Sequence, residues 1–88
     1  MLNRLTNRDR ARLARVKACP CSVCGAPGPS EAHHIKQGQQ FTCVALCTDC
    51  HRGPLLGWHG QRRAWAVRKM DELDALAVTL ENLEASHA

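Results

Sequence analysis

Residues 21–51 read CSVCGAPGPSEAHHIKQGQQFTCVALCTDCH, and the architecture of the chain is best predicted from these residues. It contains two Cys-x-x-Cys pairs, Cys21 with Cys24 and Cys47 with Cys50, on either side of residues 25–46. Each pair presents two thiolates from a tight turn, and four thiolates at about 2.3 Å from one ion form a closed tetrahedral zinc site. The sequence therefore predicts that these four cysteines bind one structural Zn²⁺.

The other two cysteines have different expected roles. Cys19 is an alternative to Cys21 as a ligand, although its spacing from Cys24 is awkward for a metal knuckle. Cys43 falls within a predicted strand, where a free cysteine behaves as a small buried apolar side chain. We therefore expect neither of them to bind the zinc.

Six cysteines in 88 residues are also compatible with a disulfide framework. The chain begins Met1-Leu2-Asn3-Arg4 and continues into a charged stretch, without the apolar core of an export signal. No apolar run approaches the length of a membrane helix. We therefore expect no membrane association, reduced thiols and a cytoplasmic location in a bacterial host cell, where paired cysteines bind metal.

The length of the chain predicts one domain, spanning residues 1–88. A chain this short buries a small core, and Phe41, Trp58 and Trp65 are its only aromatic residues apart from histidine. A structural zinc compensates for a thin core, because in zinc-finger peptides it contributes on the order of 10 kcal/mol to folding. Zinc binding and folding are therefore expected to be coupled.

The predicted elements form a small α+β fold in three segments. Segment 1–18 is a basic N-terminal helix, amphipathic over 4–17, which Thr6 or Asn7 caps and Cys19-Pro20 ends. Segment 19–60 holds the zinc knuckles, a hairpin of strands 31–35 and 41–46, and the candidate active site. Within it, residues 53–57 (GPLLG) cannot continue a helix. Segment 61–88 is one long helix, or two with a bend near 69–71.

A stripe of large apolar side chains follows the C-terminal segment: Trp65, Met70, Leu73, Leu76, Leu80 and Leu83. Its spacing of three to five residues is typical of one helix face. We expect this face to cover the hairpin and the knuckles. Dimerisation through Leu73, Leu76, Leu80 and Leu83 is the alternative, but two heptads are short for a coiled coil, so we expect a monomer.

The net charge of +4 is unevenly distributed. Residues 1–17 carry five arginines and one lysine against a single aspartate, and residues 71–88 carry only acidic charges. A basic arm and a basic middle segment fit a polyanionic partner such as DNA. The alternative for the arm alone is a solvated helix face.

Four histidines lie within or just after the stretch bounded by the cysteines. His33 and His34 are adjacent in a predicted strand, so their side chains point to opposite faces and have separate roles. His51 follows the last zinc cysteine, and His59 lies eight residues further on. Any one of them alone would suit a residue beside the zinc site or in a surface loop, but four together predict a catalytic metal site.

The pattern Cys21-x-x-Cys24, His33-His34-Ile35, Cys47-x-x-Cys50-His51 and His59 resembles that of the HNH, or ββα-metal, endonucleases. Over residues 19–70 the chain is most similar to small phage and prophage recombination-enhancement nucleases. The resemblance implies a ββα-metal core in which His33 and His59 bind the catalytic metal. It implies that His34 is the general base, and that His51 either orients the base or binds the metal.

The resemblance also implies a function, namely metal-dependent hydrolysis of DNA phosphodiester bonds in phage or prophage recombination or DNA processing. The expected catalytic ion is Mg²⁺, Mn²⁺ or Zn²⁺, and the expected partners are DNA and a recombinase filament. The alternative is a non-catalytic zinc module that binds nucleic acid. The basic residues expected to contact DNA are Arg8, Arg12, Arg15, Lys36, Arg52, Arg62 and Arg63.

Overall fold

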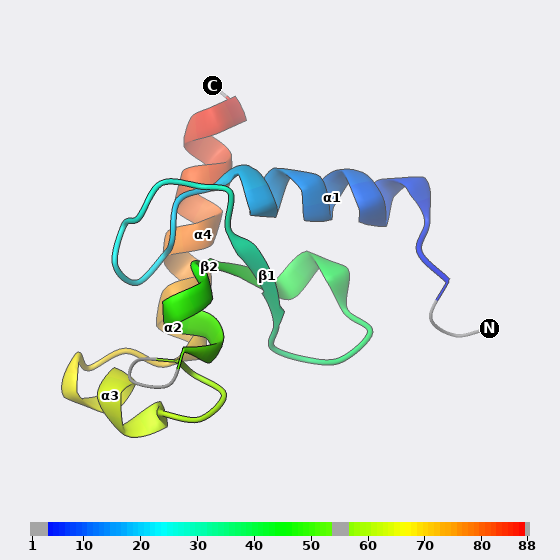
Figure 1. Ribbon diagram of the computed structural model, residues 1–88. Helices are drawn as coiled ribbons and strands as arrows, with labels where there is room; N and C mark the ends of the chain where they lie inside the picture. The colour runs from blue at the N-terminus through cyan, green and yellow to red at the C-terminus, as the bar shows by residue number, and fades with distance from the viewer. Residues whose placement is uncertain (1–3, 54–56, 88) are drawn as a thin grey trace.

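A computed structural model describes residues 4–53 and 57–87, apart from the side chains of Arg62, Ser86 and His87. Part of the predicted interruption at 53–57 (residues 54–56) and the Arg62 side chain therefore lie outside the described structure. The elements in chain order are α1 (Asn7–Ala18), β1 (Glu31–His34), η1 (Gln40–Thr42), β2 (Cys43–Leu46), α2 (Thr48–Arg52), α3 (Arg62–Val67) and α4 (Glu72–His87). The small α+β fold predicted from the sequence is confirmed (Figure 1).

The two strands form an antiparallel hairpin at the centre of the molecule. Glu31 pairs with Leu46, and His34 pairs with Cys43. The returning strand was predicted from residue 41, but it begins at Cys43, because Gln40–Thr42 form a turn of 3₁₀-helix instead. In that turn Phe41 lies under the guanidinium groups of Arg8 and Arg12 of α1, which are 5.3 and 5.2 Å from the ring centroid. The residues that were expected to begin the strand thus form a 3₁₀ turn in which Phe41 packs against α1.

Helix α1 begins and ends where its capping residues lie. Thr6 is the N-cap: its hydroxyl accepts a hydrogen bond from the Asp9 amide, and the Asp9 carboxylate accepts one from the Thr6 amide. This capping box satisfies two amides that the first turn leaves unpaired. Cys19 has an extended backbone and Pro20 follows it, so the helix stops at Ala18. The helix predicted over 4–17 therefore begins three residues later, at Asn7, and ends one residue later, at Ala18.

The core divides into two clusters on the two faces of β2, whose four residues are all buried. On one face Val44 and Leu46 pack with Trp65, Ala75 and the two Cys-x-x-Cys knuckles. On the other face the buried residues are Cys43, Ala45, Val16, Cys19 and Leu83. Helix α1 and the C-terminal half of α4 therefore cover one face of the strand, and the knuckles, α3 and the N-terminal part of α4 cover the other.

The C-terminal segment is two helices, with the break where the sequence predicted a bend. Lys69 adopts a left-handed backbone with φ of 57°, which ends α3. Asp71 and Asp74 then exchange hydrogen bonds, each side chain accepting from the other residue's amide at 2.9 and 3.0 Å. Asp71 therefore caps α4, as expected.

The inner face of α4 differs from the predicted leucine stripe. Leu73 is 67% exposed and Leu80 is 41% exposed, whereas Ala75, Thr79 and Leu83 are buried. The predicted stripe was therefore wrong at Leu73 and Leu80. The reason is Thr79, whose hydroxyl accepts from the Ala45 amide at 3.1 Å and donates to the Ala75 carbonyl at 3.1 Å.

The same hydroxyl lies 2.6 Å from the Ser22 hydroxyl in the first knuckle. Because the proton of Thr79 is used on Ala75, Ser22 is the donor in this pair. One buried polar side chain thus joins α4, β2 and the first knuckle. This contact fixes the rotation of α4, so that a threonine faces inward where hydrophobic spacing alone would place leucines.

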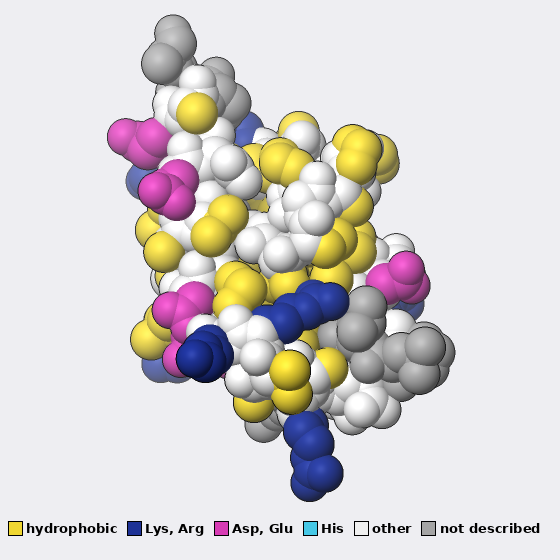
Figure 2. Space-filling view, turned by 90° about the vertical axis from the view of Figure 1, so that its left-hand side faces the viewer, with side chains coloured by type: hydrophobic (Ala, Val, Ile, Leu, Met, Phe, Trp, Pro, Cys, Tyr) yellow, Lys and Arg dark blue, Asp and Glu magenta, His cyan; other side chains and the backbone are white. Residues whose placement is uncertain are grey.

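Basic and apolar side chains are both exposed on the surface. In Figure 2, which keeps the vertical axis of Figure 1, Lys and Arg side chains stand out on the lower half of the molecule, at the level of α3. Basic charge is therefore not confined to α1. Among the residues described, no helix combines the length and apolarity that a membrane crossing requires.

Candidate metal centres

The first candidate metal centre is formed by the four cysteines of the two Cys-x-x-Cys pairs. The sulfur atoms of Cys21, Cys24, Cys47 and Cys50 all lie within 4.8 Å of one another, close enough to hold one metal ion. Cys21 and Cys50 are buried, whereas Cys24 is exposed. Four thiolates in this arrangement are consistent with a structural zinc.

Hydrogen bonds within each Cys-x-x-Cys knuckle determine its conformation. The Gly25 amide donates to the Cys21 carbonyl at 3.0 Å, and Gly25 has the left-handed φ of 77° that this tight turn needs. In the second knuckle Cys47 is the N-cap of α2, and its sulfur accepts from the Cys50 amide at 3.5 Å. The Ser22 amide donates to the Ala45 carbonyl at 2.9 Å, which ties the first knuckle to β2.

The thiols differ in how readily they ionise. Burial opposes ionisation of Cys21, but hydrogen bonds from the Cys24, Cys47 and Val23 backbone amides outweigh it and lower the pKa to about 7. Burial raises the pKa of Cys50 well above the ordinary value for a thiol. Cys21 is therefore partly ionised near neutral pH, whereas the positive charge of a metal would favour loss of the proton of Cys50.

Cys19 and Cys43 stand apart from this centre. The Cys19 thiol donates to the Arg15 carbonyl at 3.4 Å, and both cysteines are buried in the core cluster on the α1 side of β2. Burial raises the pKa of Cys43 to about 11, so it remains a neutral thiol. The predicted exclusion of both from the metal site agrees with this placement.

The second candidate centre is formed by His33, His51 and His59. One ring nitrogen of each lies within 4.8 Å of those of the others. The ring centroids of His33 are 5.1 Å from those of both His51 and His59, and the latter two are 4.6 Å apart. His33 comes from β1, His51 from α2, and His59 from the turn before α3. Hairpin, helix and turn thus bring together three of the four histidines that the sequence analysis assigned to one site.

Glu31 determines which nitrogen of His51 is free. His51 Nδ1 lies 2.9 Å from Glu31 Oε1. Hydrogen bonds from Arg52 and His51 lower the pKa of the Glu31 carboxyl to about 2, so it is ionised and only accepts. The proton of His51 is therefore on Nδ1, and the Nε2 lone pair faces His59 Nε2 at 2.9 Å. A carboxylate on the far nitrogen is typical of metal-binding histidines.

His33 has a similar carboxylate partner. Its Nε2 is hydrogen-bonded to Glu72 Oε2, from the first turn of α4. Its Nδ1 is buried and has no hydrogen-bond partner among the described residues. Burial lowers the pKa of His33, although Glu72 acts in the opposite direction. The ring is therefore neutral near pH 7, which is the form that binds a metal.

His34, the predicted general base, does not join this cluster. It points to the other face of β1, and its Nε2 lies 2.7 Å from Gln40 Oε1 in η1. His51 was expected either to orient the base or to bind the metal. His51 contacts Glu31 and His59 and not His34, whose hydrogen-bond partner is Gln40. The contacts of His51 therefore fit a metal ligand better than a residue that orients His34.

Several of the basic residues predicted to contact DNA also have partners within the protein. Arg8 and Arg12 lie over Phe41, and Arg15 Nη2 donates to the Leu83 carbonyl at 3.0 Å. Arg52 pairs with Glu31 through Nε and Nη2 at 3.1 and 2.7 Å. Lys36 and Arg63 are exposed. Arg15 thus has a structural role, since it caps the last turns of α4.

Sequence reasoning missed Glu72 and Gln40 as contacts of the candidate site. Glu72 lies 39 residues from His33, and only the packing of α4 on the hairpin brings them together. Gln40 is six residues from His34, within the same hairpin loop. A polar side chain shortly after a histidine in a loop is a weak signal, whereas nothing local indicates Glu72.

We expect Glu72→Gln to weaken metal binding at the histidine cluster about 10- to 100-fold, because it removes a carboxylate that holds His33. Zinc at the cysteines is expected to be unaffected. Titration of the zinc-loaded protein with a second equivalent of Zn²⁺ measures the effect, with the exposed Glu81→Gln on α4 as the matched control. Equal affinities in the two variants would show that Glu72 does not support the centre.

Comparisons of the chain with known protein families, with curated proteins and with solved structures find no significant match. The geometry of the two clusters therefore carries the functional argument.

Proposed function

We propose that this protein is a metal-dependent DNA endonuclease of the HNH type, which hydrolyses phosphodiester bonds. The observation that carries the proposal is the cluster of His33, His51 and His59, which is separate from the four cysteines. If a metal were needed only for folding, the four cysteines would be sufficient to bind it, and a second cluster of metal-binding side chains would not be required. The chain order β1, β2, α2 and the resemblance to phage and prophage recombination nucleases also support it.

Three protein ligands leave coordination positions for substrate and water, as in catalytic zinc sites. A divalent cation held by His33, His51 and His59 would stabilise the negative charge that develops on the phosphate and the leaving oxygen. Imidazole nitrogens suit Zn²⁺, whereas Mg²⁺ and Mn²⁺ prefer oxygen ligands. Of the three ions expected from the resemblance, the donor set favours Zn²⁺.

His34 is the general base in this proposal. The amide oxygen of Gln40 only accepts hydrogen bonds, so His34 Nε2 carries the proton and Nδ1 has the lone pair that takes a proton from water. His33 and His34 point to opposite faces of β1. The edge of β1 away from β2 pairs with no strand in the described structure. A phosphodiester along this free edge is therefore flanked by side chains from both faces.

We expect His34→Ala to lower the cleavage rate by about 10²- to 10⁴-fold, the usual contribution of a general base. Gln40→Ala is expected to have a smaller effect, because the proton of His34 is then no longer held on Nε2 by a hydrogen bond but the imidazole that acts as the base is still present. The rate of nicking of supercoiled DNA measures both, and metal content serves as the control for folding. A His34→Ala variant that cleaves at the wild-type rate would contradict the assignment of the base.

The alternative is a zinc-binding module that binds nucleic acid without cleaving it. The observation that favours it is the separation of His34 from the histidine cluster. The two functions are distinguished by assaying the zinc-loaded protein on plain, branched and recombinase-coated DNA with added Zn²⁺, Mn²⁺ or Mg²⁺. Cleavage that requires the added ion supports the nuclease. Salt-sensitive binding without cleavage under every condition would establish the module.

A further inference from the structure

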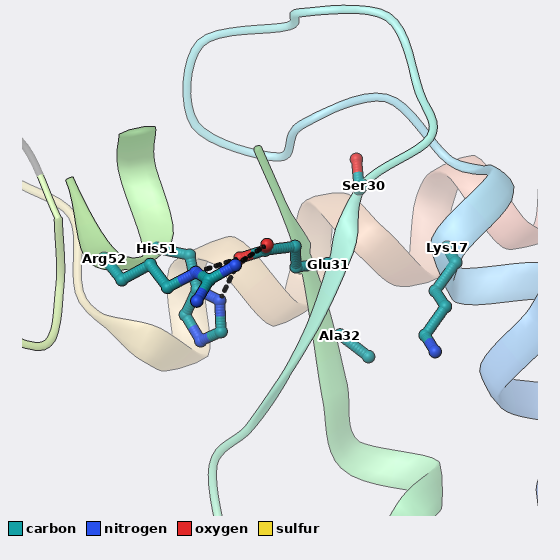
Figure 3. A pocket seen from close by; sticks show the side chains of 6 residues that line it. All are labelled: Lys17, Ser30, Glu31, Ala32, His51 and Arg52. Atoms are coloured by element: carbon teal, nitrogen blue, oxygen red, sulfur yellow. Dashed lines mark hydrogen bonds and ion pairs between the residues drawn. The ribbon is translucent and has the colours of Figure 1, made fainter. Parts of the chain in front are cut away.

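A pocket crosses β1 beside the histidine cluster. It has a volume of about 450 Å³ and is open to solvent. Figure 3 shows Lys17 on one side of the strand and His51 and Arg52 on the other. The lining residues are Lys17, Ser30, Glu31, Ala32, His51 and Arg52. The pocket volume lies within the range of small-ligand sites.

Lys17 reaches this pocket from the last turn of α1. Its side chain is exposed and makes no hydrogen bond or ion pair with any residue that the structure describes. Its backbone is fixed, because the Ser30 amide donates to the Lys17 carbonyl at 2.7 Å and the Ser30 hydroxyl donates to the Cys19 carbonyl at 2.7 Å. The end of α1 is thus tied to the start of β1, while the amine of Lys17 remains available.

Arg52 faces the pocket from the opposite side of β1. Its side chain is 63% exposed and donates Nε–H and one Nη2–H to Glu31. A guanidinium has five N–H donors, so three remain for another acceptor. Glu31 therefore orients the planar group without saturating it, and planar donors of this kind suit phosphate oxygens.

The charges around the pocket favour an anion. Lys17 and Arg52 each contribute +1 and ionised Glu31 contributes −1, so these three side chains carry a net charge of +1. His51 belongs both to the pocket lining and to the histidine cluster, since its Nδ1 contacts Glu31 and its Nε2 faces His59. An anion bound in the pocket would therefore lie one imidazole ring away from the position of a metal at the cluster.

We propose that this pocket binds one phosphate group of a nucleic-acid strand, between Lys17 and Arg52. This inference rests on the proposed function and assigns the strand a path along the free edge of β1. Glu31 and Ala32, which line the pocket, lie two residues before His33 and His34, on the order of 7 Å along the strand. This distance is of the same order as that between successive phosphates, so the pocket holds a phosphate that flanks the cleaved one.

The test compares DNA binding by Lys17→Gln and Lys69→Gln. Both remove one exposed positive charge, and Lys69 lies outside the pocket, between α3 and α4. Both substitutions are made in the 88-residue, zinc-loaded chain that also carries His59→Ala, so that binding to a labelled duplex is measured by fluorescence anisotropy without turnover. Salt is varied from about 50 to 200 mM, where each phosphate contact contributes about 0.9 to the slope of log K against log salt.

We expect Lys17→Gln to reduce the slope by about one and Lys69→Gln to leave it unchanged. An unchanged slope for Lys17→Gln, or equal reductions in both variants, would overturn the proposal. Inorganic phosphate is the second probe, followed by the NMR signals of Ser30 and Ala32. If it shifts these signals only when Lys17 is present while the DNA slope is unchanged, the pocket takes free phosphate and the nucleic-acid assignment fails. If Lys17→Gln reduces the slope but the protein with His59 intact never cleaves DNA, the pocket is established as a phosphate site and the nuclease function is rejected.

Discussion

Replacing Cys24 by alanine is expected to leave most of the protein unfolded at 25 °C, whereas replacing Cys19 by alanine is expected to leave it folded. Burial alone predicts the reverse order, because Cys24 is exposed and Cys19 is only 4% exposed. The difference comes from the metal: Cys24 belongs to the four-thiolate cluster and Cys19 does not. Structural zinc contributes about 10 kcal/mol or more in small domains, comparable with the whole stability of such a domain.

Circular dichroism and zinc content of the two variants measure this effect. Cys19→Ala is expected to retain one tightly bound zinc and to lose only about 1–2 kcal/mol, as is usual for a small change in a core. A chelator should unfold the wild-type protein and Cys19→Ala alike. If Cys24→Ala proves as stable as Cys19→Ala, zinc at the cysteines does not hold the fold together.

Replacing His59 by alanine is expected to abolish binding of the second metal and to lower cleavage about a thousandfold or more. A catalytic cation stabilises the transition state by several kcal/mol, and each 1.36 kcal/mol corresponds to a factor of ten. His59 suits this test better than His33, because its side chain is exposed and its removal leaves no buried cavity. The fold and the zinc at the cysteines should be unchanged.

Metal content separates this result from the loss of the base. His59→Ala should bind one zinc per chain, whereas wild type and His34→Ala should bind two. A His59→Ala protein that still binds two metal ions would remove His59 from the ligand set. If it binds one ion and cleaves at the wild-type rate, the histidine cluster is not the catalytic centre.

The parts of the structure that could be predicted from the sequence are those determined by short spacings. The two Cys-x-x-Cys turns, the left-handed Gly25 and the hairpin that joins the knuckles are local features. The break before Asp71 was also predictable, because an aspartate there caps a helix. A site of four histidines was expected from their number and from the resemblance, and His33, His51 and His59 lie together while His34 does not.

The parts that could not be predicted depend on contacts between distant segments. Thr79 faces inward because its hydroxyl meets the Ala45 amide, 34 residues earlier, and this turns Leu73 and Leu80 toward solvent. Glu72 reaches His33 through the same packing of α4. Hydrophobic periodicity identifies a helix but does not determine its rotation when a buried hydrogen bond competes with leucine burial.

Strand β2 is covered on both faces, and this has a consequence for how the chain unfolds. The zinc knuckles and Trp65 pack on one side of Val44 and Leu46, while α1 and Leu83 pack on the other side, against Cys43 and Ala45. Neither half has a strand of its own to pack against. If the four cysteines hold a metal, its release would expose one side of the strand on which the other half is built, and we therefore expect the whole chain to unfold as a single cooperative unit when the ion is removed.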